Sequence, residues 1–236
     1  MRNKLSRDKI ETLNTISKGR HRTNLLKVQE QKALAFLVEH TPSCITPNML
    51  TSIGMVGSII TAGSFVLAAY IHINYLLLGI LGFAINWLGD SLDGRIAYYR
   101  KTPRKWYGFS LDITVDWITT ILIGLGYVIY VDGPWKFLGF GFVVMYGWEM
   151  ITTLLRYKIT DKYSIDSGLF GPTEVRILIS MILILEVLIE DSIIYSGVII
   201  CIMLFIANLT DTNKLLNMAD SRDITDRENK LNKGDD

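Results

Sequence analysis

Cysteine, proline, histidine and net charge are all scarce in this chain of 236 residues. It has 2 cysteines, 5 prolines and 3 histidines, and 24 basic against 23 acidic residues leave a net charge of +1. Cys44 precedes the first long apolar stretch and Cys201 lies in the last, so the cysteines predict no disulfide framework. The near-zero net charge gives no basis for nucleic-acid binding. Residues 1–47 lack a central apolar run, so no secretory signal peptide is predicted.

Apolar residues, by contrast, make up 50% of the chain. They gather into stretches of about 20 residues, the length that a helix needs to cross a bilayer. This distribution excludes a disordered chain, a small disulfide-rich scaffold and an ordinary soluble domain. The predicted fold class is an all-α polytopic membrane protein. Its six candidate transmembrane helices are 48–70, 74–97, 109–130, 135–156, 174–188 and 192–209.

The lysines and arginines between the spans predict an orientation. Nine precede the first span, five lie in 95–105 and three in 156–162, whereas the three intervening turns hold one at most. The positive-inside rule therefore places both termini and the two basic loops in the cytoplasm.

The two ends of the chain lie outside the predicted six-helix domain, 48–209. Residues 1–47 form a basic cytoplasmic segment, and 23–40 has apolar residues at near-helical spacing. That pattern predicts an amphipathic helix that lies in the membrane interface, or one that packs on a partner. Residues 210–236 mix acids and bases with few apolar residues, which predicts a polar cytoplasmic tail that is solvated or disordered.

Four aspartates occupy the second and third spans near their cytoplasmic ends. Asp90 and Asp93 are three residues apart, and Asp112 and Asp116 are four apart, so each pair lies on one helix face. An aspartate at membrane depth costs a few kcal/mol on insertion scales, roughly 3, and marks a functional site by default. A short connection lets the two pairs face each other. Helix capping, or pairing with Arg95 or Arg100, is the structural alternative.

A divalent cation is the simplest compensation for four clustered carboxylates. The all-oxygen ligand set favours Mg²⁺, Mn²⁺ or Ca²⁺ over zinc. Small residues, Gly94, Ala97 and Gly108, flank the aspartates, so a flat or phosphate-bearing ligand can approach the backbone closely.

The string DSLDGRIAYYRKTPRKWYGFSLDITVD, residues 90–116, resembles the signature of the CDP-alcohol phosphotransferase family. That signature is Asp, two residues, Asp-Gly, two residues, Ala-Arg, about eight residues, Gly, three residues, Asp, three residues, Asp. The segment TPNMLT, residues 46–51, is also similar to the family, as are the six spans and the preceding interfacial helix. The matching residues of the signature are Asp90, Asp93, Gly94, Ala97, Gly108, Asp112 and Asp116.

The resemblance implies transfer of a phosphoalcohol group from a CDP-linked donor to a hydroxyl acceptor, with release of CMP. It implies Mg²⁺ or Mn²⁺, two ions in all, held by the four aspartates, with Asp116 also acting as general base. It further implies a homodimer. CDP contacts are expected from Asn48, Gly94, Ala97 and Gly108.

The chain departs from the signature in two ways. Tyr98 replaces the arginine after Ala97, and the stretch before Gly108 is one residue longer. Arg100 can replace that arginine only if the helix ends near Ala97, because two positions along a helix are about 200° apart. Otherwise the phosphate contacts fall to Arg95, Arg104 or Lys105.

Two arginines suggest the chemistry of the acceptor. Arg156 ends the fourth span and Arg176 begins the fifth, and both are predicted to line an anionic acceptor pocket. Pairing of Arg176 with Glu174 and snorkelling of Arg156 are the structural alternatives. The predicted donor is CDP-diacylglycerol, and the acceptor is inositol phosphate, slightly preferred, or glycerol phosphate. The active site is expected to face the cytoplasm, at the inner membrane if the chain is bacterial.

Two other functions remain open. Residues 171–176, GPTEVR, resemble a run in choline and ethanolamine phosphotransferases, which move a head group from a CDP-alcohol to diacylglycerol. A divalent-cation transporter is an alternative of a different class. It predicts acids from several helices at the bilayer midplane and inverted repeats, and no repeat is evident.

Overall fold

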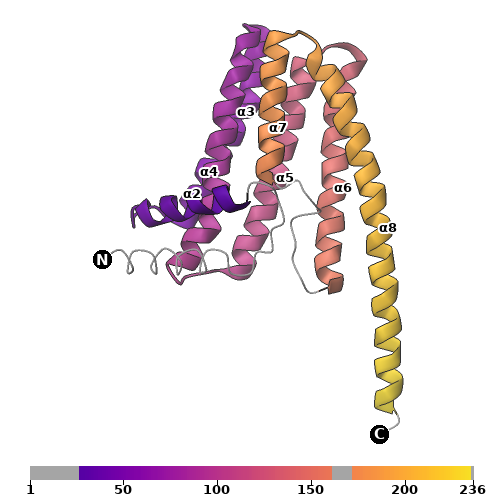
Figure 1. Cartoon of the computed structure of the whole chain (residues 1–236). Helices are drawn as coiled ribbons and strands as arrows, with labels where there is room; N and C mark the ends of the chain where they lie inside the picture. Colours follow the sequence, from indigo (N-terminus) through magenta and orange to yellow (C-terminus); the bar gives the residue numbers. More distant parts are fainter. Residues whose placement is uncertain (1–26, 161–171, 235–236) are drawn as a thin grey trace.

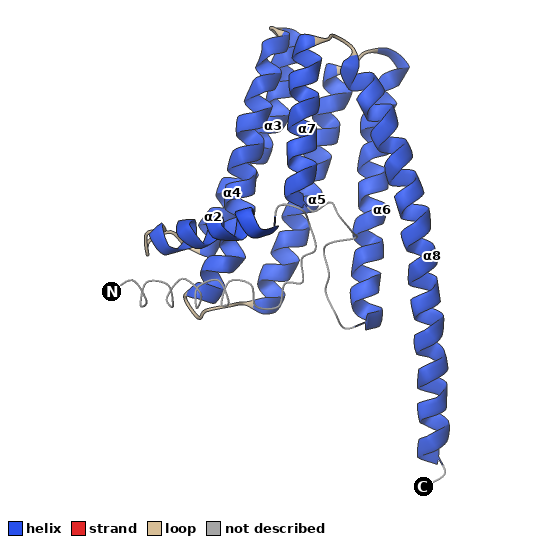
Figure 2. Ribbon diagram, in the orientation of Figure 1, coloured by secondary structure: helices blue, strands red, loops and turns tan. Residues whose placement is uncertain are grey.

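The computed structural model describes residues 27–160 and 172–234, and every regular element in these two stretches is helical (Figure 2). The short 3₁₀ turns are η1, Ile73–Leu76, and η2, Gly133–Lys136. The α-helices are α2 (Lys27–His40), α3 (Pro47–Tyr70), α4 (Leu77–Tyr99), α5 (Lys105–Tyr130), α6 (Phe137–Thr160), α7 (Pro172–Leu188) and α8 (Ser192–Gly234).

Five of the six predicted spans are helices long and apolar enough to cross a membrane: α3, α4 with η1, α5, α6 and α8. The fifth predicted span corresponds to α7, whose 17 residues are about 26 Å of helix. In Figure 1, α7 stands beside the long helices but begins higher than the lower ends of α4 and α5. The spanning role of α7 remains a prediction.

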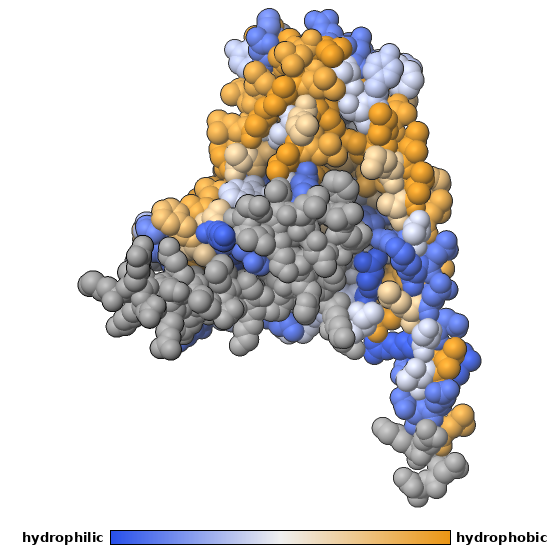
Figure 3. Space-filling view, in the orientation of Figure 1, coloured by the Kyte–Doolittle hydropathy of each residue, from blue (hydrophilic) through white to orange (hydrophobic). Residues whose placement is uncertain are grey.

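An apolar surface covers the upper part of the bundle, and hydrophilic residues gather above and below it (Figure 3). Exposed leucines, isoleucines and phenylalanines occur on α3 to α8, for example Ile59, Leu81, Phe140 and Ile206. Soluble monomers rarely expose so large an apolar surface, because contact with water is unfavourable, whereas contact with lipid is favourable. The chain is an integral membrane protein.

Helices α3 and α4 pack backbone to backbone because glycines line their contact. A Cβ atom on Gly89 would lie 2.4 Å from the backbone nitrogen of Gly54, and one on Gly57 would lie 2.4 Å from that of Asn86. Real Cβ atoms do not approach so closely, so only glycine fits. This contact fixes the C-terminal half of α4, which carries Asp90 and Asp93, against α3.

The N-terminal helix α2 lies crosswise to the long helices (Figure 1). Leu34, Ala35 and Val38 are buried in a cluster with residues of α3 and α4, whereas Phe36 is 59% exposed. Protein therefore covers one apolar face of α2. Placement of α2 in the membrane interface stays a prediction, and residues 23–26 of the predicted helix lie outside the described residues.

The tail differs from the expectation. Helix α8 has 43 residues, so the polar segment after Asp211 continues the last span as a helix to Gly234, well beyond the rest of the bundle (Figure 1). The disordered alternative is wrong for this stretch. Opposite charges four residues apart, such as Asp223 with Arg227, support such a solvated helix.

A buried glutamate joins three helices at the end of the bundle opposite α2. Glu186 of α7 accepts hydrogen bonds from the Tyr130 hydroxyl of α5 (2.7 Å), and from Ser192 Oγ (3.0 Å) and Ile193 N (2.7 Å) at the start of α8. A carboxylate at membrane depth is tolerated because these donors satisfy it. The acid is therefore structural.

Candidate active site

Three carboxylates from two helices meet inside the bundle. Asp90 of α4 and Asp112 and Asp116 of α5 each offer a ligand oxygen, and these oxygens lie within 4.8 Å of one another. All three side chains are half-buried. Sequence spacing predicted that the aspartate pairs would face each other, and for these three residues the structure has that arrangement.

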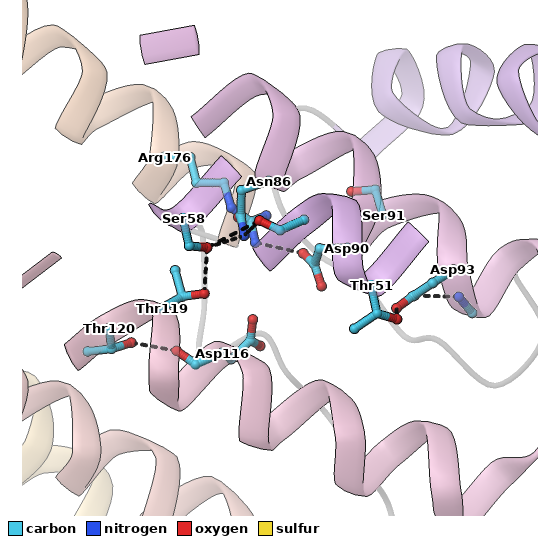
Figure 4. A network of polar contacts seen from close by, with 12 residues as sticks. Thr51, Ser58, Asn86, Asp90, Ser91, Asp93, Asp116, Thr119, Thr120 and Arg176 are labelled. Carbon is cyan, nitrogen blue, oxygen red and sulfur yellow. Dashed lines mark hydrogen bonds and ion pairs between the residues drawn. The ribbon is translucent and has the colours of Figure 1, made fainter. Parts of the chain in front are cut away.

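Asp93 lies apart from the other three. Its Oδ2 accepts a hydrogen bond from the Thr51 hydroxyl of α3 at 2.7 Å, and its Oδ1 accepts one from the backbone N–H of Gly94 (Figure 4). These bonds hold the carboxylate toward α3 and toward a neighbouring pocket. Of the four predicted ligands, three therefore form one group, and Asp93 lies beside that group.

Arg176 of α7 contacts the carboxylates directly. Its Nη2 atom donates to Asp90 Oδ2 at 2.6 Å, and the two side chains are 14% and 23% exposed (Figure 4). The predicted alternative partner, Glu174, is not the partner of this ion pair. Arg176 offsets one of three negative charges, so most of the charge of the cluster still requires compensation.

The donor set fits a divalent cation. Two oxygens bound to one Mg²⁺ or Ca²⁺ ion are no more than about 4 to 5 Å apart, and the oxygens of Asp90, Asp112 and Asp116 satisfy this limit. Histidine and cysteine are absent from the group, which disfavours zinc. The ligands are hard carboxylate oxygens, as Mg²⁺ and Mn²⁺ prefer.

A pocket of about 210 Å³ adjoins the carboxylates, where the start of α3, the end of α4 and the start of α5 meet. Asp93 and Asp112 line it, so Asp112 belongs both to the pocket and to the carboxylate group. A Cβ atom on Gly108 would meet nothing within 4 Å, so open space lies over this glycine. The lining also includes four residues that the sequence predicted to contact CDP: Asn48, Gly94, Ala97 and Gly108.

Cationic groups stand at one side of this pocket. Arg104 donates to Asn48 Oδ1 at 2.5 Å, and its guanidinium carbon is 4.0 Å from the centre of the Tyr107 ring. Asn48 Nδ2 donates to the Tyr107 hydroxyl at 3.3 Å. The first turn of α5, which begins at Lys105, has neither an acidic residue nor a side-chain cap, so its partial positive charge is not neutralised.

Arg100 does not occupy the position proposed for it. Helix α4 runs on to Tyr99, and the Arg100 guanidinium donates to the carbonyls of Pro42 (2.8 Å) and Ile45 (2.6 Å) in the loop between α2 and α3. It is not part of the pocket lining. The 200° separation along the helix explains this result, because α4 does not end at Ala97.

Arg95 and Arg156 have partners outside the pocket. Arg95 is buried, donates to the Ser91 carbonyl, and lies 3.7 Å from Glu30 of α2. Arg156 of α6 lies 3.3 Å from Asp211 of α8. Arg156 was predicted to line an acceptor pocket together with Arg176, and that role stays a prediction.

Sequence reasoning missed a polar cluster one helical turn before Asp90. Asn86 of α4 donates from Nδ2 to Ser58 Oγ at 3.0 Å, and Ser58 shares a 2.8 Å hydrogen bond with Thr119 of α5 (Figure 4). Asn86 Oδ1 is buried without a partner among the described residues. Its position one turn before Asp90 was the signal available in the sequence.

Comparison with known proteins identifies the family. The family model described as CDP-alcohol phosphatidyltransferase matches residues 44–211, which covers α3 to α7 and the start of α8. No curated protein matches the chain. The match spans more than half of the chain and includes the three carboxylates and the pocket. The transporter alternative loses its basis, because the family consists of phosphotransferases, and this chain belongs to the CDP-alcohol phosphatidyltransferase family.

Proposed function

We propose that this protein transfers a phosphatidyl group from CDP-diacylglycerol to a hydroxyl of a small polar acceptor and releases CMP. The observation that carries the proposal is the group formed by Asp90, Asp112 and Asp116, whose oxygens lie within 4.8 Å of one another beside a pocket with a cationic side. A diphosphate donor needs both features, because its charge must be neutralised where the bond breaks.

Asp90, Asp112 and Asp116 are the proposed ligands of Mg²⁺ or Mn²⁺. Asp93, which lines the pocket with Asp112, is the proposed additional ligand if two ions bind. Bound divalent ions would supply charge neutralisation to the diphosphate and to the departing CMP. The hydrogen bond from Thr51 keeps Asp93 at the pocket wall.

Asp116 is the proposed general base. The acceptor hydroxyl gives its proton to the Asp116 carboxylate while its oxygen forms a bond to the phosphorus that carries the diacylglycerol group. The bond between that phosphorus and the bridging oxygen then breaks, and its electron pair leaves with CMP. Asp116 belongs to the carboxylate group and lies one turn from Asp112, so proton transfer and charge compensation take place together.

The CDP part of the donor is proposed to bind in the pocket lined by Asn48, Gly94, Ala97 and Gly108. Open space above Gly108 suits a flat cytosine ring or a sugar. Exposed apolar helix faces beside the site would accept the acyl chains of a lipid donor. Transfer then takes place at the cytoplasmic end of the bundle.

Arg176 favours an anionic acceptor. Its guanidinium lies at the carboxylates, where it attracts a phosphate on the acceptor and repels a quaternary ammonium group. Inositol phosphate and glycerol phosphate are therefore the preferred acceptors. The choline and ethanolamine type of reaction, with diacylglycerol as acceptor, is the alternative, and its sequence signal begins at Gly171, outside the described residues. A homodimer with cytoplasmic active sites and termini remains part of the proposal.

The test is CMP release by purified full-length protein in detergent with Mg²⁺ or Mn²⁺. CDP-diacylglycerol is supplied with inositol phosphate, glycerol phosphate, inositol, serine or no acceptor in separate reactions. The proposal predicts CMP release with a phosphorylated acceptor, at a rate at least about 100-fold lower in Asp116→Asn protein. Release only from CDP-choline or CDP-ethanolamine with diacylglycerol would establish the alternative instead.

A further inference from the structure

The structure gives one arginine of the loop between α4 and α5 a different setting from its neighbours. Arg104 lines the pocket, whereas Arg95 and Arg100 do not. Arg95 is paired with Glu30, and Arg100 donates its hydrogen bonds to backbone carbonyls of the loop between α2 and α3. Of the arginines that the sequence offered for phosphate contact, Arg104 is therefore the one positioned at the pocket.

The partners of Arg104 are neutral. Asn48 accepts one hydrogen bond at 2.5 Å, and the Tyr107 ring lies 4.0 Å from the guanidinium carbon. Among the residues that the structure describes, no carboxylate forms an ion pair with Arg104. Its positive charge is thus not cancelled, and most of its N–H donors remain available for a ligand.

These three side chains also hold one another. Asn48 Nδ2 donates to the Tyr107 hydroxyl, which closes a triangle between the start of α3 and the first turn of α5. A long arginine side chain that is already oriented loses less conformational entropy when a ligand binds. A guanidinium fixed in this way is suited to bind phosphate through two hydrogen bonds.

Tyr98 lines the same pocket. It occupies the position at which the family signature has arginine, so the chain lacks a cation there. The pocket retains a guanidinium on another of its lining residues, Arg104.

We propose that Arg104, held by Asn48 and Tyr107, binds the diphosphate of the CDP-linked donor in place of an arginine at position 98. This inference rests on the proposed function for the identity of the donor. Arg104 acts on binding and on placement of the phosphates beside the carboxylates, and no proton transfer is assigned to it.

The experiment measures binding of CDP and of uncharged cytidine to purified full-length protein in detergent with Mn²⁺ present. Three variants are compared with the wild type: Arg104→Gln, the double variant Tyr98→Arg with Arg104→Gln, and the control Lys101→Gln. Lys101 lies in the same loop and does not line the pocket, so its variant removes an equal charge nearby. Thermal unfolding midpoints establish that each variant is folded.

Loss of charge-assisted hydrogen bonds to phosphate predicts that Arg104→Gln binds CDP roughly 10- to 100-fold more weakly. Cytidine binding should stay within about twofold of the wild type, since Arg104 contacts the phosphates. Lys101→Gln should match the wild type, and arginine at position 98 should restore most of the lost CDP affinity.

The inference is overturned if a folded Arg104→Gln protein binds CDP as the wild type does, or if cytidine and CDP weaken equally. It is also overturned if a folded double variant recovers no CDP affinity. Failure of the proposed function is a separate result: the wild type would bind CDP with these variant effects and yet release no CMP from any CDP-linked donor.

Discussion

The guanidinium of Arg176 donates to Asp90 Oδ2 at 2.6 Å, although 86 residues separate the two in sequence. The contact places the only described cation of α7 against the carboxylates of α4 and α5. Helix α7 is shorter than the length expected of a membrane span. The ion pair connects this helix to the carboxylate group. Arg176 therefore contributes both to the charge of the site and to the packing of α7 on α4.

Removal of the Arg176 charge should destabilise the protein most when no metal ion is present. Arg176→Gln leaves three half-buried carboxylates with less compensation, and breaking a buried pair costs about 3 to 5 kcal/mol, less here because both side chains are partly exposed. Thermal unfolding in detergent should show a lower midpoint in EDTA, and added Mn²⁺ should narrow the difference from the wild type. A midpoint equal to that of the wild type in EDTA would contradict this account.

A double-mutant cycle isolates the pair itself. Asp90→Asn with Arg176→Gln should be less destabilised than the sum of the single variants, with a coupling of about 0.5 to 3 kcal/mol. Additive effects would mean that Arg176 stabilises α7 through its other contacts.

The separation of Asp93 from the other aspartates predicts unequal effects on metal binding. Asp112→Asn should abolish tight Mn²⁺ binding, because Asp112 belongs to the group whose oxygens lie within 4.8 Å. Asp93→Asn should retain one bound Mn²⁺ with weaker binding of CDP. Electron paramagnetic resonance titration counts the bound Mn²⁺. Equal loss of all Mn²⁺ in both variants would show that the four carboxylates act as one site.

Two glycines should respond in opposite ways to alanine. Gly89→Ala forces a Cβ atom into the backbone of α3 and should lower stability by about 1 to 3 kcal/mol. Gly108→Ala has open space for its methyl group and should keep the unfolding midpoint of the wild type, while the KM for the CDP-linked donor rises. A stable Gly89→Ala protein would show that α3 and α4 separate more easily than their packing indicates.

Glu186 provides a structural contrast to the aspartates of the candidate site. Glu186→Ala removes the acceptor of bonds from Tyr130, Ser192 and Ile193, and hydrogen bonds to a charged group are worth about 1.5 to 3 kcal/mol each. The unfolding midpoint should fall, while the KM values of the folded protein stay those of the wild type, because Glu186 lies at the opposite end of the bundle. The exposed neighbour Glu190 gives the control, Glu190→Gln. A changed donor KM in Glu186→Ala would contradict a purely structural role.

The sequence allowed the helical membrane fold and most of the carboxylate group to be predicted, because both depend on local spacing. Apolar stretches about as long as a bilayer is thick located five helices long enough to cross it. Aspartates three and four residues apart predicted the shared faces on α4 and α5. Helix ends were predicted less well, because the length of an apolar stretch predicts only the part of a helix that crosses the bilayer. Helix α8 continues well beyond its apolar stretch.

The remaining features depend on contacts between distant segments. Nothing near Asp93 in sequence indicates that Thr51 binds it, and nothing near Arg100 indicates its partners Pro42 and Ile45. Arg156 pairs with Asp211, which belongs to a segment that was expected to be a solvated tail. In each case a hydrogen bond or ion pair across the fold decided where the side chain lies.

The central claim is that a divalent ion held by Asp90, Asp112 and Asp116 enables transfer from a CDP-linked donor. The most direct measurement is the rate of CMP release by the wild type and by Asp116→Asn, each with Mn²⁺ and with EDTA, and with equal unfolding midpoints as the criterion for folding. The account predicts that the wild type releases CMP with Mn²⁺ and not with EDTA. It also predicts that the variant releases CMP at least about 100-fold more slowly with Mn²⁺. Equal CMP release by a folded Asp116→Asn protein, or undiminished wild-type release in EDTA, would contradict it.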